Sequence, residues 1–181
     1  ETNEIDTLVM DGSANVNLPG ACWNSQNNNI VFSSSREPHD EIYVIEDTGQ
    51  PGDEIQVTER SDYMAYEPTF SPDGEWIVFV SHPVDVENRG VIMKYKLDHS
   101  VTYQALTNAD DDCRQPNWSP SGESILFQQY EHRQWDIWIM NIDGSNKEKI
   151  TSGDGDKTDA CFTSDGRYII YSCDSELEFA H

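Results

Sequence analysis

The chain has 181 residues, of which 34 are acidic and 11 basic, so its formal net charge is −23. This length is typical of one domain with its own hydrophobic core. The charge excludes nucleic acids and anionic membranes as partners, because contacts to phosphate require many lysine and arginine side chains. No apolar stretch approaches the roughly 18 residues that a transmembrane helix needs.

The first predicted element in chain order covers residues 5–18. Two short apolar stretches flank Asp11 and Gly12, a pair that favours a tight hairpin turn. Residues 136–150 show the same pattern around Asp143 and Gly144. We therefore expect a pair of strands in residues 5–18.

A longer repeat follows, in which an aromatic residue precedes a turn. It recurs every 44 to 48 residues, at Trp23, Phe70, Trp118 and Phe162. The second and fullest copy reads Phe70-Ser-Pro-Asp-Gly, in which Pro presets φ and Gly accepts a positive φ. Each turn leads into a short apolar run, at residues 30–32, 77–79, 125–127 and 169–171.

A second kind of segment lies between these copies. It covers residues 41–45, 91–95 and 136–140, and a turn and a short strand follow each, ending at Thr58, Thr107 and Thr151. The apolar runs are short, β-branched and bounded by turns, which favours strands over helices. Because apolar and polar residues do not alternate within them, both faces of each sheet are expected to be buried.

The strand count predicts an all-β, four-bladed β-propeller of four-stranded antiparallel blades. The last anchor lacks a following strand pair, and residues 5–18 supply one. One blade would therefore combine residues 160–175 with 4–18, so that strands from the two chain ends pair and close the ring. The other blades would cover residues 20–58, 67–107 and 115–151. Closure by one chain and pairing of two chains into a larger ring both remain open.

The aromatic-Ser-Pro-Asp-Gly turn, the Ile-Val-Phe run after it and residues 136–146 resemble the TolB-like (WD-like) β-propeller repeat family. The resemblance covers roughly residues 5–173, with residues 24–29 departing from the Ser-Pro-Asp-Gly pattern. Members of this family more often have six or seven blades. They include periplasmic binding partners, side domains of proteases and carbohydrate-active enzymes. The resemblance implies a location outside the cytoplasm, either periplasmic or extracellular, and the start at Glu1 is interpreted as a trimmed secreted form.

The inner strands of a propeller line a central channel, and loops on a rigid scaffold usually carry function. Three residues before the anchors stand Gly20, Glu67, Gln115 and Asp159, which we expect at the channel mouth. Acidic loops nearby contain Asp110, Asp111, Asp112 and Asp156. Converging carboxylates suit Ca²⁺ or another divalent cation, although a solvated loop accounts for the same composition.

The loops after the apolar runs carry a second set of candidates. They contain His39, His82 and His132, which suit acid–base chemistry or a transition metal if the fold gathers them. The candidate catalytic residues are His82, His132, Glu131 and Glu37. The candidate ligand-binding residues in these loops are His39, Arg133 and Trp135. The alternative is that these are surface residues without a shared role.

The four cysteines match no zinc pattern. Cys22 and Cys161 occupy the same repeat position, one before the anchor, and the closed ring would place them on adjacent inner strands. Cys161 and Cys173 are expected to face each other across one hairpin, whereas Cys113 has no obvious partner. Burial as small apolar residues is the alternative to any disulfide.

Two functions are consistent with these patterns. The first is a secreted binding propeller, a monomer or homodimer, whose rim recognises a carbohydrate or a protein. The second is a polysaccharide hydrolase or lyase that uses rim carboxylates or histidines, with or without a divalent cation. Because no established catalytic motif is present, the sequence favours binding.

Overall fold

The computed structural model describes residues 20–36, 38–47, 53–86, 89–98, 100 and 102–174. Every regular element in these residues is a β-strand, which confirms the predicted all-β class. Among the same residues, no helix has the length and apolar character needed to cross a membrane.

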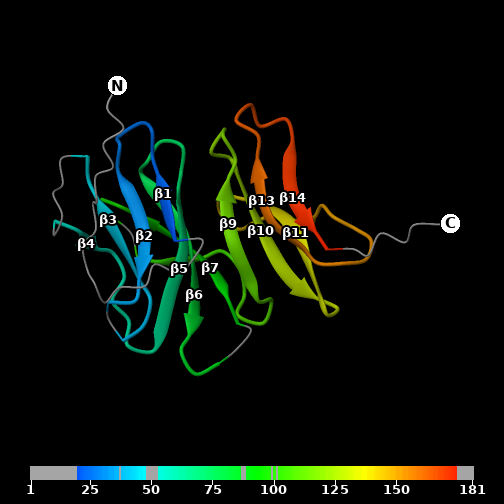
Figure 1. Ribbon diagram of the computed structural model, residues 1–181, viewed down its shortest axis with the longest axis horizontal. Coiled ribbons are helices and arrows are strands. Elements are labelled where there is room, and N and C mark those ends of the chain that lie inside the picture. The colour runs from blue at the N-terminus through cyan, green and yellow to red at the C-terminus, as the bar shows by residue number, and fades with distance from the viewer. Residues whose placement is uncertain are drawn as a thin grey trace.

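The strands form three antiparallel sheets of four strands and one of two in the described part of the chain. The sheets follow one another side by side in chain order, from blue to red in Figure 1. Sheet 1 contains β1 (Ala21–Trp23), β2 (Ile30–Ser34), β3 (Glu41–Ile45) and β4 (Ile55–Gln56). Sheet 2 contains β5 (Tyr63–Phe70), β6 (Trp76–Pro83), β7 (Val91–Lys96) and β8 (Gln104–Ala105).

Sheet 3 repeats the same arrangement. It contains β9 (Cys113–Trp118), β10 (Ser124–Glu131), β11 (Gln134–Asn141) and β12 (Glu148–Lys149). Sheet 4 contains β13 (Lys157–Phe162) and β14 (Ile169–Cys173). Within each sheet the strands pair in sequence order, so every sheet is an antiparallel meander.

The hydrophobic core lies between neighbouring sheets. Ile77 and Phe79 of β6 pack with Val31 and Ile42 of sheet 1. Val78 and Val80 of β6 face the other way and pack with residues of sheet 3. Because neighbours cover both faces, a strand such as β6 is apolar at consecutive positions, as the sequence pattern predicted.

The repeated turns are stabilised locally by a hydroxyl group. The Ser71 hydroxyl accepts a hydrogen bond from the Trp76 backbone N–H at 3.0 Å. Ser119 accepts one from Ser124 N–H in the same way, and Thr163 accepts one from Tyr168 N–H, each at 3.1 Å. The turn motif is therefore explained by local structure and needs no ligand.

The first strands of successive sheets lie next to one another around a common axis. Contacts join β1 to β5, β5 to β9, and β9 to β13. In the described residues, no contact joins β1 to β13 or β14. The proposed N-terminal strands in residues 4–18 lie outside the described residues. Closure of the ring and the four-blade count therefore stay predictions.

Ile170 in β14 tests this closure. Its counterparts Val78 and Leu126 are fully buried, whereas Ile170 is 60% exposed among the described residues. If residues 4–18 complete this blade and a neighbouring blade covers it, Ile170→Lys will lower the free energy of unfolding by about 2–3 kcal/mol, measured by urea denaturation. Unchanged stability would contradict the closed ring.

Two glycines with the same backbone conformation test the contact between sheets 2 and 3. Gly144 and Gly153 both have φ of +85°. A Cβ on Gly144 would lie 2.8 Å from the Leu106 carbonyl oxygen, whereas one on Gly153 would meet nothing within 4 Å. We expect both alanine variants to lose about 1–2 kcal/mol from left-handed strain. Gly144→Ala will lose about 1–3 kcal/mol more, and equal losses in urea denaturation would show that the two sheets separate easily here.

Candidate functional site: the channel between the first strands

Glu67, Gln115 and Asp159 share one unusual backbone conformation. Their φ angles are +55°, +51° and +55°. Each lies where the pairing of a first strand with its neighbour shifts register, at a β-bulge. A positive φ is costly for residues with a Cβ, and bulges often re-aim a side chain at a functional site. The structure therefore repeats a strained geometry at the three positions that the sequence singled out.

Hydrogen bonds join these three residues across the sheets. The Gln115 backbone N–H donates to Glu67 Oε2 at 2.7 Å. The Asp159 backbone N–H donates to Gln115 Oε1 at 2.9 Å, and Gln115 Nε2 donates to Asp159 Oδ1 at 3.0 Å. The Glu67 and Gln115 side chains thus each accept the backbone N–H of the equivalent residue in the next sheet. Gly20, at the same position in sheet 1, has no side chain for this contact, so the hydrogen-bonded series starts at Glu67.

The three residues line a cavity of about 350 Å³ between the first strands. Pro68, Pro116 and Ala160 follow them on its wall. Cys22 and Cys161 line it as well, together with Thr69 and Asn117 at the same repeat position. The channel therefore has a carboxylate and amide layer, an apolar layer, and a layer of small polar and thiol groups.

Burial and charge both act on Glu67. Burial raises the pKa of Glu67, and the nearby Asp159 carboxylate raises it further. The hydrogen bond from Gln115 N–H and the charge of Arg114 lower this pKa, but burial dominates. The channel thus contains two neighbouring carboxyl groups in a partly desolvated setting, an arrangement that favours binding of a cation.

Arg114 and Trp135 form a second layer beside the channel. The Arg114 guanidinium lies 5.4 Å from the centre of the Trp135 ring, and its Nε donates to Asp112 Oδ1 at 3.3 Å. The Trp135 ring also lies 5.2 Å from that of Tyr130. The Trp135 ring therefore packs against both Arg114 and Tyr130. Sequence reasoning missed Arg114, although it directly precedes Gln115 and is one of only 11 basic residues.

Each of the four predicted cation ligands makes contacts within the protein. Asp112 accepts a hydrogen bond from Gly90 N–H at 2.9 Å, and Asp156 accepts one from Trp135 N–H at 2.8 Å. Asp110 and Asp111 lie near Arg89 and Lys147, at 3.6 and 3.7 Å. Across the described ranges, no group of three or more His, Cys, Asp or Glu residues is placed to hold a metal ion. These acids are engaged in structural contacts instead.

The described histidines do not gather at one place either. His82 is buried on β6, with its ring 6.5 Å from that of Tyr66. His132 and Arg133 have φ of +53° and +68° and form the tight turn between β10 and β11. His39 borders a separate surface cavity, and Glu131 lies 3.8 Å from Lys149. Glu37 lies outside the described residues.

None of the four described cysteines forms a disulfide bond. In the hairpin of sheet 4, Cys161 pairs with Ile170, whereas Cys173 pairs with Lys157. The expectation that Cys161 and Cys173 face each other was therefore wrong. Phe162 and Ile169 pair beside the turn, so Ile170 lies opposite Cys161, and Cys173 lies at the far end of β14.

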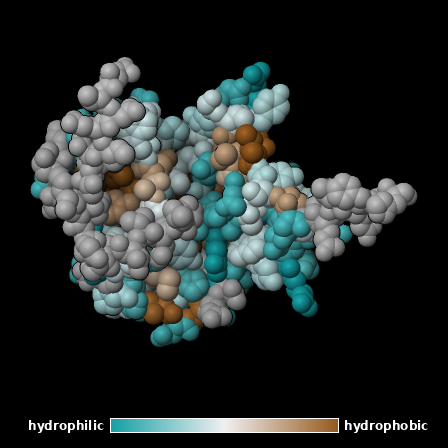
Figure 2. All heavy atoms as spheres, in the orientation of Figure 1, coloured by the Kyte–Doolittle hydropathy of each residue, from teal (hydrophilic) through white to brown (hydrophobic). Residues whose placement is uncertain are grey.

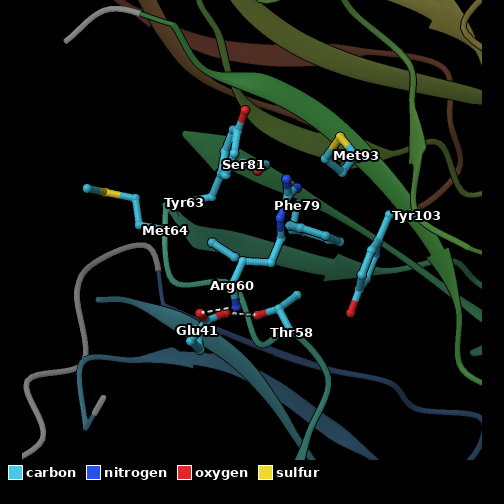
Figure 3. A pocket seen from close by; sticks show the side chains of 10 residues that line it. Glu41, Thr58, Arg60, Tyr63, Met64, Phe79, Ser81, Met93 and Tyr103 are labelled. Carbon is cyan, nitrogen blue, oxygen red and sulfur yellow. Dashed lines mark hydrogen bonds between the residues drawn. The ribbon is translucent and has the colours of Figure 1, made fainter. Parts of the chain in front are cut away.

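A smaller cavity lies where sheets 1 and 2 meet (Figure 3). Figure 3 shows Glu41 bonded to the Thr58 hydroxyl and to the Arg60 backbone, which donates to Glu41 Oε1 at 3.0 Å. The space open to water is only about 10 Å³, enough for one molecule. Glu41 is therefore a structural carboxylate that holds the chain after β4.

Three four-stranded antiparallel meanders and a two-stranded hairpin, with a polar channel between their first strands, define a β-propeller protein. No protein-family model matches the sequence. A TolB homolog of Chlorobium luteolum is 29% identical over 143 residues, which cover 79% of this chain and 31% of the relative. The Tol-Pal system protein TolB of Francisella tularensis subsp. holarctica is 30% identical over 127 residues, which cover 69% of this chain and 28% of the relative.

The structure agrees with these sequence matches. A putative TolB from Agrobacterium tumefaciens superimposes with a TM-score of 0.78 at 21% identity, over 96% of this chain and 60% of that one. The chain belongs to the TolB-like β-propeller family, which confirms the resemblance seen in the sequence. It spans about a third of the length of the curated relatives that it matches.

Two substitutions at Glu67 separate its hydrogen bond from its charge. Glu67→Ala leaves the Gln115 N–H without its acceptor and will cost about 1–3 kcal/mol of stability. Glu67→Gln keeps an acceptor and removes the charge. Because the pKa of Glu67 is raised above 4.5 in the folded protein, its ionisation lowers stability as the pH rises above that value.

The measurement is urea denaturation between about pH 4 and pH 8. Relative to the parent protein, Glu67→Gln should gain stability as the pH rises through the folded pKa of Glu67. A constant difference between the two proteins over this range would contradict the raised pKa.

Proposed function

We propose that this chain forms part of a periplasmic protein-binding propeller, in which the channel at Glu67, Gln115 and Asp159 holds a basic segment of a partner protein. The observation that carries the proposal is the strained and hydrogen-bonded set of these three residues around a cavity of about 350 Å³. Positions held in costly backbone conformations by their surroundings are typical of binding sites.

The electrostatics support a basic ligand. Glu67 and Asp159 lie close enough for the charge of Asp159 to raise the pKa of Glu67. A bound Lys or Arg side chain would relieve this repulsion. The net charge of −23 also attracts basic segments over longer distances. In the view of Figure 2, the described residues at the surface are mainly hydrophilic, and hydrophobic residues form small patches.

The relatives point to a protein partner. The name of the Francisella relative places that protein in the Tol-Pal system. A periplasmic site of action is the corresponding proposal for this chain. We favour a protein over a carbohydrate, because the Trp135 ring packs against Tyr130 and the Arg114 guanidinium. The geometry does not favour an enzyme, because His82 lies on β6 whereas His132 lies in the turn between β10 and β11.

Isosteric neutralisation of the channel tests the proposal. Short fluorescein-labelled peptides with one fixed Lys or Arg and otherwise mixed sequence are titrated with the protein and followed by fluorescence polarisation. We expect saturable binding that weakens as the salt concentration rises from about 0.05 to 0.5 M. The double variant Glu67→Gln/Asp159→Asn should lose at least about tenfold in affinity, which equals about 1.4 kcal/mol.

Asp165→Asn is the matched control, because Asp165 is an acid in the turn after β13, paired with Arg167 at 2.6 Å and away from the channel lining. It should bind the peptides as the parent protein does. An equal loss of affinity in both variants would show that the effect comes from the net charge of the protein and not from the channel. If the parent protein binds neutral oligosaccharides and the double variant does not, the partner is a carbohydrate and not a protein.

A further inference from the structure

A further cavity lies between the turns of sheets 2 and 3, apart from the channel. Its volume is about 270 Å³, and it shares no lining residue with the channel. Its walls include Trp76 and Lys94 from sheet 2, and Trp118 and Ile142 from sheet 3. The turn residues Ser71 and Asp73 complete one side.

Lys94 departs from the repeat at this place. It pairs with Val78 of β6, and the equivalent pairs are Val44 with Val31 in sheet 1 and Ile139 with Leu126 in sheet 3. The repeat therefore uses an apolar residue at this position in both other four-stranded sheets. Since an apolar residue would fill the same place without burying a charge, packing does not explain Lys94.

Trp76 departs from the repeat as well. It directly precedes the apolar run of β6, where the other copies have Asn29, Ser124 and Tyr168. Its ring lies 4.9 Å from Lys94 Nζ and 5.7 Å from Lys96 Nζ. Both departures thus meet at one junction, and together they build one side of the cavity.

The ammonium group of Lys94 is poorly compensated. Lys94 is only 8% exposed, and its Nζ donates to the Ile142 carbonyl oxygen at 2.6 Å. No carboxylate of the described residues forms an ion pair with it. Burial lowers the pKa of Lys94, and Asp143 acts more weakly in the opposite direction. An ammonium group has three donors, so two remain for a ligand.

Trp118 and Asp73 are polar residues of the same walls. The indole N–H of the buried Trp118 has no hydrogen-bond partner in the described part of the chain. The Asp73 Oδ1 atom already accepts from the Ser71 hydroxyl at 2.5 Å and from the Glu75 N–H at 3.0 Å. Lys94 therefore offers donors beside the Trp76 ring, which complements an anionic group on a ligand with a flat, weakly polar face.

We propose that this cavity is a second binding site, which takes a small carboxylate-bearing ligand of the size of a sugar acid. The carboxylate accepts hydrogen bonds from Lys94 Nζ, and one face of the ligand packs along Trp76. A volume of about 270 Å³ suits a single ring. The negative surface of the protein disfavours long polyanions, so a monomeric acid is the class that fits.

The experiment uses isothermal titration calorimetry with three probes: D-glucuronate, D-glucose and benzoate. Glucuronate should bind saturably, and glucose should bind at least about tenfold more weakly because it lacks the carboxylate. Comparison with benzoate also shows whether the ligand is a sugar acid or an aromatic acid. Binding of benzoate in place of glucuronate would assign the site to an aromatic acid, whereas equal binding of glucuronate and glucose would overturn the role of Lys94.

Substitutions taken from the repeat itself separate binding from folding. Lys94→Val introduces the residue type of the equivalent position in sheet 1, Val44. Trp76→Ser introduces that of the equivalent position in sheet 3, Ser124. We expect Lys94→Val to lose at least about tenfold in affinity for the acid while its melting temperature is no lower, because a buried charge without a counter-ion is removed. Trp76→Ser should weaken binding of the same probe.

Lys96→Met is the matched control. Lys96 also approaches the Trp76 ring, but its Nζ pairs with Asp98 at 2.9 Å and it does not line the cavity. This variant should bind the acid as the parent protein does. Absence of saturable binding by either acid, or full binding by Lys94→Val, would overturn the proposal. A large drop in the melting temperature of Lys94→Val would assign Lys94 to folding alone.

Discussion

The structure depends on the burial of both faces of the second strand in each four-stranded sheet. Ile77 and Phe79 pack toward sheet 1, while Val78 and Val80 pack toward sheet 3. A single sheet of this composition would expose one apolar face to water, at a cost of about 25 cal/mol for each Å². Each sheet is therefore stable only between neighbours, which is the physical basis of a repeat protein. This packing also brings the first strands together and so creates the channel.

Once the sheets are stacked, equivalent positions can be compared across the repeat. Most positions serve the same purpose in every copy, as the hydroxyl groups of Ser71, Ser119 and Thr163 do in their turns. Positions that break the pattern are more informative. Lys94 stands where other copies have valine or isoleucine. Gly20 has no side chain at the position that Glu67, Gln115 and Asp159 occupy in the other copies. The repeat thus provides its own reference, against which functional departures become visible in one chain.

The two cavities differ in the charge that they offer. Carboxyl groups line the channel, whereas the cavity between the turns of sheets 2 and 3 presents an ammonium group. An acidic protein that binds basic segments at one place can therefore accommodate a small acid at another. The two sites lie at different levels along β5, because Glu67 precedes the turn residues that begin at Ser71. Ligands at the two sites need not compete.

The sequence alone determined the all-β class, the apolar runs, the turns and the channel set of Glu67, Gln115 and Asp159, because these follow from local periodicity and from position within a repeat. It did not determine which loops meet. The predicted cation ligands Asp112 and Asp156 bind backbone N–H groups of the preceding sheet, which the sequence did not indicate. The pairing of Cys161 depends on the register of β13 and β14, and the surroundings of Lys94 depend on two sheets. Only the tertiary structure decided these points, since hydrogen bonds and cavities between sheets join residues far apart in the chain.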